Sequence, residues 1–264
     1  MVELMKIFES HAHYDDERFD TDRDYIIQEM YNFGVKKIVS AGYSLEGTLR
    51  NINLAKKYQF IYTTCGISPN DLNENWEEDI NKIDNIIKNN LDTGKIVAVG
   101  EIGLDYHYDT DKNIQKKAFI KQIEIANKYN LPIVIHTREA VMDTISILKE
   151  NEVIKKGIFH CCPLNRELVK EALKLGYYIS LAGPITFKNS KNADEIINLV
   201  PLNKMLVETD SPYLAPEPVR GTRNDSRNLK YILQKIAKVK EIETEEIAEI
   251  TYENAKKIYQ IKNP

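Results

Sequence analysis

The sequence has few cysteines and no long hydrophobic run, and each absence excludes a class of protein. Its 264 residues include only three cysteines, Cys65, Cys161 and Cys162. An odd number with one adjacent pair does not match the disulfide framework of a small secreted domain. No apolar run approaches the roughly 20 residues that span a membrane, and the N-terminus lacks a charged region followed by an apolar one. We therefore expect a cytoplasmic protein that is not associated with a membrane.

The sequence also lacks an excess of basic residues. Its 36 lysines and arginines are outnumbered by 40 aspartates and glutamates, which gives a net charge of −4. No global field therefore draws the protein to nucleic acid or to an anionic membrane, and a polyanion would have to be bound by a local basic patch or by metal. Linkers, low-complexity tracts and repeats are missing as well. We expect residues 1–264 to form a single domain, and no sequence feature points to an obligate protein partner.

Short apolar segments alternate with amphipathic helical patterns along the whole chain. Such segments are typical of parallel strands that are covered on both faces. The expected strands lie at residues 5–8, 37–41, 60–64, 96–99, 133–135, 157–159, 178–181 and 205–207. Gly34, Gly94, Gly157 and Gly176 fall between a helical pattern and a strand, where a left-handed helix cap is expected. Eight strand–helix units predict a (β/α)₈ TIM barrel, with a doubly wound open sheet as the alternative because alternation does not settle closure.

The first expected strand leads into the stretch Ser10-His11-Ala12-His13. Residues two apart on a strand face the same side, so both imidazoles would point to one place. Two imidazoles on one face make half of a site for a divalent metal. Because a His-x-His pair also occurs by chance in surface loops, the metal interpretation depends on what the other strands supply.

Histidines and carboxylates also follow other strands of the series. Barrel enzymes carry their chemistry at the C-terminal ends of the strands. The residues at these positions, which are the candidate metal ligands, are His11, His13, Glu101, His136, His160 and Asp210. His11, His13 and Asp210 would hold one ion, and His136 and His160 a second, with Glu101 bridging the two. Asp210 and Glu101 are also the catalytic candidates, and Asp210 is placed to take a proton from the attacking water.

Each candidate ligand has a structural alternative when it is taken alone. His136 could be a buried core histidine, and Glu101 and Asp210 could cap the segments that follow them. His160 stands beside two cysteines and could belong to a thiolate zinc site, but no second cysteine pair exists to complete one. Because coincidence at six corresponding positions is improbable, the metal interpretation is favoured.

Some residues of the expected loops are candidates to contact substrate. Arg138 follows His136 by two residues and is expected at the pocket mouth. Arg220 and Arg223 flank a Gly-Thr pair after the last strand, where they could clamp a phosphate or simply be solvated. Tyr213 is a candidate to line the pocket.

Taken in order, these motifs resemble those of the TatD-type metal-dependent hydrolases. The motifs are Ser-His-Ala-His at 10–13, Val-Gly-Glu-Ile-Gly-Leu-Asp-Tyr at 99–106, His-Thr-Arg-Glu-Ala at 136–140, His-Cys at 160–161 and Val-Glu-Thr-Asp-Ser-Pro-Tyr-Leu-Ala-Pro at 207–216. The resemblance covers essentially the whole chain. It implies a distorted TIM barrel of the amidohydrolase superfamily, two divalent ions such as Mg, Mn or Zn, and deoxyribonuclease activity. It also assigns metal binding to the same six residues.

Four positions depart from the family pattern. Glu9 stands where the family usually has Asp, and Cys162-Pro163-Leu164 replaces Phe-Ser-Gly. Ser68 replaces a histidine that faces the substrate in the family. The loop Arg-Gly-x-x-Asn-x-Pro ends in Ser226 rather than Pro. None of the four is a metal ligand, and the substrate-binding candidates that match or replace family positions are Ser68, Arg138, Arg220 and Asn224.

We therefore expect a metal-dependent hydrolase of phosphodiester bonds that uses a metal-activated hydroxide. The expected activity is that of a deoxyribonuclease acting like a 3′–5′ exonuclease on single-stranded ends, because a barrel mouth admits an end more easily than a duplex interior. One alternative is a deacylase or esterase of the same superfamily, since the same metal chemistry attacks a carbonyl carbon. The other is a metal-binding protein that has lost catalysis.

Overall fold

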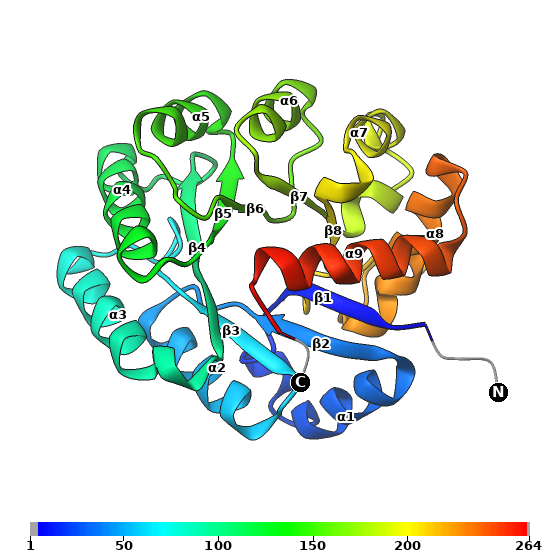
Figure 1. The fold of residues 1–264 in the computed structure, drawn as a ribbon, viewed down its shortest axis with the longest axis horizontal. Helices are drawn as coiled ribbons and strands as arrows, with labels where there is room; N and C mark the ends of the chain where they lie inside the picture. Colours follow the sequence, from blue (N-terminus) through cyan, green and yellow to red (C-terminus); the bar gives the residue numbers. More distant parts are fainter. Residues whose placement is uncertain (1–4, 263–264) are drawn as a thin grey trace.

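The computed structural model describes residues 5–262, whose eight strands form one parallel sheet in chain order (Figure 1). The strands are β1 (Ile7–Ala12), β2 (Val35–Ser40), β3 (Ile61–Cys65), β4 (Ile96–Asp105), β5 (Ile133–Arg138), β6 (Gly157–Phe159), β7 (Tyr178–Leu181) and β8 (Met205–Val207). Every strand pairs with the next one along the chain, as in a barrel and unlike a doubly wound sheet. The predicted TIM barrel is confirmed.

Helices surround this sheet on its outer side (Figure 1). The α-helices are α1 (Arg23–Phe33), α2 (Leu45–Lys57), α3 (Trp76–Asn90), α4 (Lys112–Tyr129), α5 (Val141–Glu150), α6 (Arg166–Lys174), α7 (Ala193–Leu199), α8 (Leu229–Lys240) and α9 (Thr244–Ile258). Short 3₁₀ helices are η1 (Glu17–Phe19), η2 (Leu91–Thr93), η3 (Gly183–Thr186), η4 (Leu202–Lys204) and η5 (Ser226–Asn228). Within residues 5–262, no helix is both long enough and apolar enough to cross a membrane.

The barrel is distorted where β1 meets β8. No regular ladder joins these two strands in the described part of the chain. Individual bonds close the seam instead: Ser10 Oγ donates to the Val207 carbonyl at 2.8 Å. Further along, the Asp210 amide donates to the His11 carbonyl at 3.1 Å, and the His13 amide donates to the Ser211 carbonyl at 2.7 Å. These bonds bring the candidate ligands of β1 next to the loop that carries Asp210.

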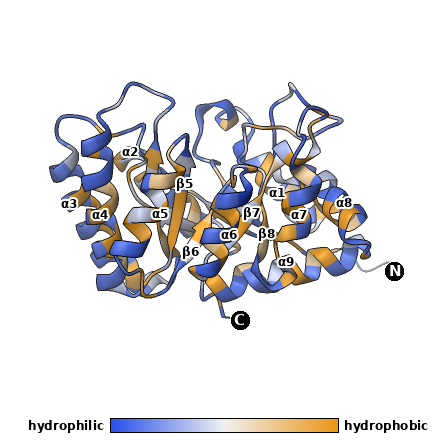
Figure 2. Cartoon of the chain, turned by 90° about the horizontal axis from the view of Figure 1, so that it is seen from above, coloured by the Kyte–Doolittle hydropathy of each residue, from blue (hydrophilic) through white to orange (hydrophobic). Residues whose placement is uncertain are grey.

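Helix α9 closes one end of the barrel. A hydrophobic cluster joins the strands to this helix. It contains side chains from seven strands, among them Phe8, Val134 and Leu206, together with Ile258 at the end of α9 and Tyr259 directly after it. The Tyr259 ring stacks on Phe8 with centroids 6.1 Å apart. In Figure 2 this helix lies along one edge of the molecule and the longer loops lie along the opposite edge. The C-terminal ends of the strands therefore remain open for a site.

Three strands have the predicted bounds, at residues 157–159, 178–181 and 205–207. Three others extend further than predicted: β1 to Ala12, β4 to Asp105 and β5 to Arg138. The polar side chains in these extensions are mostly buried, including Glu9, His11 and Glu101. An apolar run marks only the part of such a strand that lies in the hydrophobic core, so hydrophobicity alone does not predict its polar end.

The helix-cap prediction is confirmed for three glycines and wrong for the fourth. Gly34, Gly94 and Gly176 have positive φ angles. Gly157 instead begins β6, where a Cβ atom would approach the Ile133 carbonyl oxygen to 2.1 Å. Lys156 takes the left-handed conformation in its place, with φ of 59°. Gly157 is therefore required by the close approach of two strands and not by a helix cap.

Candidate active site

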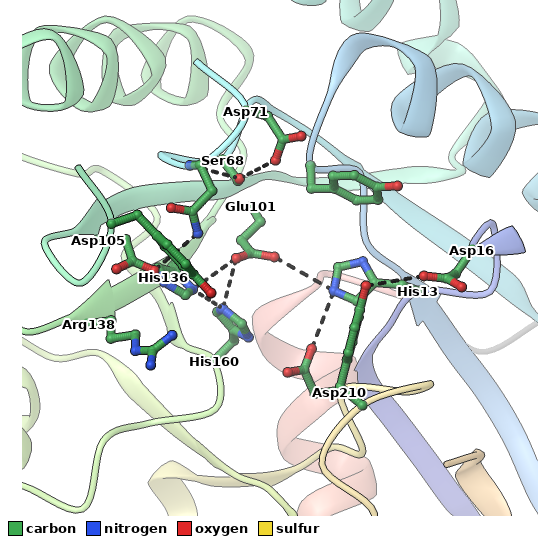
Figure 3. Close-up of a pocket in the computed structure, with 14 residues that line it drawn as sticks. His13, Asp16, Ser68, Asp71, Glu101, Asp105, His136, Arg138, His160 and Asp210 are labelled. Atoms are coloured by element: carbon green, nitrogen blue, oxygen red, sulfur yellow. Dashed lines mark hydrogen bonds and ion pairs between the residues drawn. The ribbon is translucent and has the colours of Figure 1, made fainter. Parts of the chain in front are cut away.

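A pocket of about 450 Å³ lies at the C-terminal ends of the strands (Figure 3). Five of the six candidate metal ligands line it, namely His13, Glu101, His136, His160 and Asp210. His11, the sixth, is buried and contacts the others. A pocket of this size suits a group about as large as one nucleotide or one small ester.

The first group of donor atoms comes from the ends of β1 and β8. His11 Nε2 and His13 Nε2 lie 3.2 Å apart. Asp210 Oδ1 lies 3.3 Å from His13 Nε2 and 3.7 Å from His11 Nε2. The end of β1 and the residue that follows it thus bring both imidazoles to one point, as the sequence predicts. Three donor atoms at this mutual spacing can hold one divalent ion.

Glu101 lies between this group and a second one (Figure 3). Its Oε2 atom is 3.5 Å from His11 Nε2 and 3.8 Å from His13 Nε2. Its Oε1 atom is 3.0 Å from His136 Nδ1 and 3.2 Å from His160 Nε2. The two oxygens of one carboxylate therefore face two separate sets of imidazoles.

A bulge in β4 sets the position of Glu101. Four residues of β4, from Val99 to Ile102, lie opposite only three of β5, from Ile133 to Ile135. Such a bulge turns a side chain out of the regular alternation. Two residues beyond Glu101, Gly103 has φ of 142°, and a Cβ there would come within 2.0 Å of the His136 carbonyl oxygen. Glycine at this position therefore allows β4 to run close to the strand that carries His136.

Two further carboxylates orient the imidazoles from behind. Asp105 Oδ2 lies 2.9 Å from His136 Nε2 and accepts a bond from Asn70 Nδ2 at 3.1 Å. Glu208 Oε1 accepts a bond from the Cys161 amide at 2.6 Å and lies 3.5 Å from His160 Nδ1, an ion-pair distance. Carboxylates in this role fix the ring and its tautomer. Sequence reasoning gave neither residue a role, although Asp105 ends the strand of Glu101 and Glu208 stands two residues before Asp210.

The electrostatics of the cluster fit a cation. Burial alone would raise the pKa of Glu101, but the charge of His160 and bonds from three imidazoles hold it well below its usual range. Burial also opposes ionisation of Asp210, yet the bond to His13 lowers its pKa to about 2. The pKa of His13 rises to about 9 because the bond to Asp210 and the nearby carboxylates outweigh burial. These shifts show that the buried carboxylates are coupled to the imidazoles around them, and a divalent ion could neutralise the same carboxylates.

The candidate substrate-binding residues fall into two sets. Ser68 and Arg138 line the pocket, and Ser68 Oγ donates to Asp71 Oδ2 at 2.5 Å. Arg220 does not line it; its guanidinium lies 4.0 Å from the Phe187 ring centroid. Asn224 is buried and donates to the Thr209 and Tyr213 carbonyls. The structure therefore brings only two of the four to the pocket.

The fold and the site define the class of protein. Imidazoles and carboxylates converge at the C-terminal end of a TIM barrel, which is where such barrels carry their chemistry. This donor set is characteristic of metal-dependent hydrolases.

Comparison with known proteins identifies the family within that class. A family model described as TatD related DNase matches residues 8–260. The chain is 41% identical over 258 residues to the uncharacterized metal-dependent hydrolase YabD of Bacillus subtilis, covering 97% of this chain and 99% of that protein. It is 34% identical to the uncharacterized metal-dependent hydrolase YcfH of Escherichia coli, with 97% of each chain covered. The crystal structure of YjjV, a TatD homolog from Escherichia coli, superposes with a TM-score of 0.91 at 24% identity, covering 98% of this chain and 100% of that one. The chain belongs to the TatD family of metal-dependent hydrolases.

Proposed function

We propose that this protein is a deoxyribonuclease that hydrolyses phosphodiester bonds at single-stranded DNA ends, in the manner of a 3′–5′ exonuclease. The observation that carries the proposal is the position of Glu101, whose two oxygens face two sets of imidazoles on the floor of an open pocket. An arrangement of two ions about a shared carboxylate is typical of enzymes that displace groups at phosphorus. The family model, described as TatD related DNase, supports the choice of substrate.

The residues would hold two divalent ions. His11, His13 and Asp210 would bind one, His136 and His160 the other, and Glu101 would bridge them. Imidazole-rich donor sets favour zinc or manganese, and the carboxylates also accept magnesium. When bound, the ions would supply Lewis-acid polarisation of the scissile bond and lower the pKa of water.

Asp210 would accept the proton of the attacking water. Its low pKa keeps the carboxylate ionised at neutral pH, and it lies at the pocket floor beside His13. Asp105 would orient His136 through the bond to Nε2, and Glu208 would orient His160. Asp105 faces the cluster from the end of β4, and Asp210 and Glu208 face it from the segment that follows β8.

A single-stranded end fits the pocket better than a duplex does. The opening lies among the loops at one end of the barrel and holds about one nucleotide. Among the described residues, Arg138 is the only lysine or arginine that lines it. Few phosphates can therefore be neutralised by side chains, and affinity must depend on the ions and on contacts to the nucleotide itself.

We also propose that residues 1–264 form one hydrolase domain and that the protein works in the cytoplasm. All eight strands contribute to one sheet, which supports residues 1–264 as one hydrolase domain. Cys65, Cys161 and Cys162 are free thiols, as a reducing cytoplasm maintains them.

The proposal is tested by the products of labelled oligonucleotides. Protein loaded with manganese or zinc is expected to shorten a 5′-labelled single strand one nucleotide at a time from its 3′ end and to cleave the matching duplex more slowly. The measurement is a time course on denaturing gels, with a panel of carboxyl esters assayed in parallel. Turnover of an ester with no cleavage of any oligonucleotide would establish the carbonyl hydrolase instead. A protein inactive on both, yet binding metal, would be a binding protein.

Arg138→Ala is expected to weaken binding of a short single strand and to reduce its salt dependence. The Arg138 guanidinium has no ion-pair partner among residues 5–262 and lies 5.6 Å from the Tyr108 ring centroid, so it is available for a phosphate. Loss of one contact should lower the slope of log affinity against log salt by about 0.7 on a single strand. Fluorescence anisotropy at several salt concentrations, with Asp210→Asn as background, measures the slope.

A matched variant separates a specific contact from loss of charge. Lys88→Ala removes one positive charge from the last turn of α3, outside the pocket, and should leave the slope unchanged. Arg220→Ala should also have little effect, because Arg220 stacks on Phe187 and does not line the pocket. Equal slopes for wild type and Arg138→Ala would remove Arg138 from the binding site.

A further inference from the structure

An exposed aromatic ring stands at the rim of the pocket. Tyr213 follows Asp210 by three residues, lines the pocket and is 45% exposed. Its ring centroid lies 6.1 Å from that of His13, with an interplanar angle of 77°. A single exposed aromatic needs no explanation on an ordinary surface. Here it adjoins a proposed metal ligand, and its orientation is fixed by further contacts.

Two neighbouring side chains hold this ring in place. The Tyr213 hydroxyl donates to Asp16 Oδ2 at 3.2 Å. The same carboxylate accepts two bonds from Arg18, each at 2.9 Å. The Arg18 guanidinium carbon lies 4.1 Å from the Tyr213 ring centroid and so covers one face of the ring. Because Asp16 fixes both the phenol and the cation stacked on it, the ring is oriented before any ligand arrives, which reduces the entropy lost on binding.

The charge around this ring disfavours a phosphate and tolerates a neutral group. Asp16 and Asp71 line the same pocket, and the charge of Arg18 is balanced by its paired bonds to Asp16. Arg138 and His136 lie on one side of Glu101, and His13 and Asp16 lie on the other (Figure 3). The cation available to a phosphate is therefore separated from the aromatic ring. What the ring can offer beside these carboxylates is a flat, neutral stacking face.

We propose that Tyr213, covered on one face by Arg18 and held by Asp16, is a stacking subsite for the nucleobase next to the phosphodiester that is cleaved. The inference rests on the proposed nuclease function and specifies how the substrate is recognised. Stacking of a base on an aromatic side chain is nearly independent of sequence, because every base has a π-face. A base inside a duplex is already stacked and paired, so the subsite selects unpaired ends without an extended basic surface.

The test compares a base-bearing substrate with one that lacks the base. The two substrates are a single-stranded oligonucleotide and the same oligonucleotide with abasic tetrahydrofuran residues at its 3′ end. Wild type is expected to cleave the base-bearing end with a kcat/KM about tenfold or more higher. Tyr213→Leu should lower kcat/KM on the base-bearing end by the same factor and leave the abasic end nearly unchanged. Tyr213→Phe keeps the ring and should retain most of the preference.

A spectroscopic measurement reports stacking without turnover. An oligonucleotide with 2-aminopurine at its 3′ end should lose fluorescence on binding to Asp210→Asn protein, because stacking quenches this base. The double variant with Tyr213→Leu should bind with much less quenching. Tyr25→Leu is the matched control, since Tyr25 is 64% exposed on α1 and does not line the pocket.

The outcomes separate this subsite from the function on which it rests. Equal cleavage of both ends by wild type would overturn the subsite and leave the nuclease function standing. A loss in Tyr213→Leu that is the same for both ends would also overturn it, because the ring would then act by positioning His13 or the Asp210 loop. No cleavage of either oligonucleotide, with turnover of a carboxyl ester, would overturn the proposed function itself.

Discussion

Replacing Asp210 with asparagine is expected to abolish hydrolysis while the protein still binds an oligonucleotide. The Asp210 carboxylate is ionised at neutral pH and can accept a proton, whereas an amide cannot. Loss of a general base lowers kcat by about 100-fold to 10,000-fold. Asp210 has φ of 56°, a left-handed conformation that asparagine adopts more readily than most residues, so the backbone should be preserved. Single-turnover cleavage measures the chemical step, and anisotropy measures binding.

The control for this variant removes the charge of a carboxylate that lies outside the site. Asp194→Asn removes an exposed carboxylate that pairs with Lys235 and is expected to turn over like wild type. Metal content is measured on both variants, because Asp210 is also a proposed ligand. An Asp210→Asn protein that keeps its ions and its turnover would contradict the role given to this residue.

The succession of strands and helices is predictable from the sequence, but the C-terminal ends of three strands are not. Apolar runs mark β6, β7 and β8 correctly because most of their residues belong to the hydrophobic core. In β1 the run of apolar residues stops at Phe8, yet the strand continues through Glu9 and His11, both of which are buried. These side chains are buried by one another and by the strand ends that meet there. A pattern based on hydrophobicity does not register burial of that kind.

The candidate ligands were predictable because a barrel brings together the ends of strands far apart in sequence. A histidine or carboxylate at a strand end therefore lies on the same face of the barrel as the others, whatever the loop conformations. Loop residues lack this constraint. Asn224 looks like a substrate contact in sequence, but its side chain is buried and ties together the Thr209 and Tyr213 carbonyls. The position of the Asn224 side chain depends on how the loop after β8 folds, and the spacing of residues along the sequence does not reveal that.

Asp105 and Glu208, the carboxylates that orient the imidazoles, were also not predictable from the sequence. Asp105 reaches His136 because β4 and β5 are paired in a register shifted by one residue. Glu208 reaches the Cys161 amide because β6 and β8 lie on either side of the short strand β7. The first contact follows from strand register and the second from the way two strands flank a third, and the composition of the strands specifies neither contact.

Replacing Glu101 with glutamine is expected to weaken binding of both metal ions at once. Each oxygen of Glu101 faces a different set of imidazoles, at 3.5 Å from His11 Nε2 and at 3.0 Å from His136 Nδ1. The substitution removes the negative charge and replaces one of the two oxygens with an NH₂ group, which donates hydrogen bonds and cannot bind a cation. The loss of affinity should exceed the roughly 10-fold to 100-fold that follows removal of an outer-shell partner. Equilibrium dialysis with zinc or manganese measures the stoichiometry and affinity.

His136→Ala provides the comparison that makes this result specific. His136 lies beside only one Glu101 oxygen, so its removal should eliminate the ion at His136 and His160 and leave the ion at His11 and His13 bound. The expected stoichiometries are two ions for wild type, one for His136→Ala and fewer than one for Glu101→Gln under the same conditions. If wild type never binds more than one ion in excess metal, the bridging role of Glu101 is wrong. If Glu101→Gln loses one ion and holds the other with unchanged affinity, its carboxylate serves a single ion, and the two sets of imidazoles act independently.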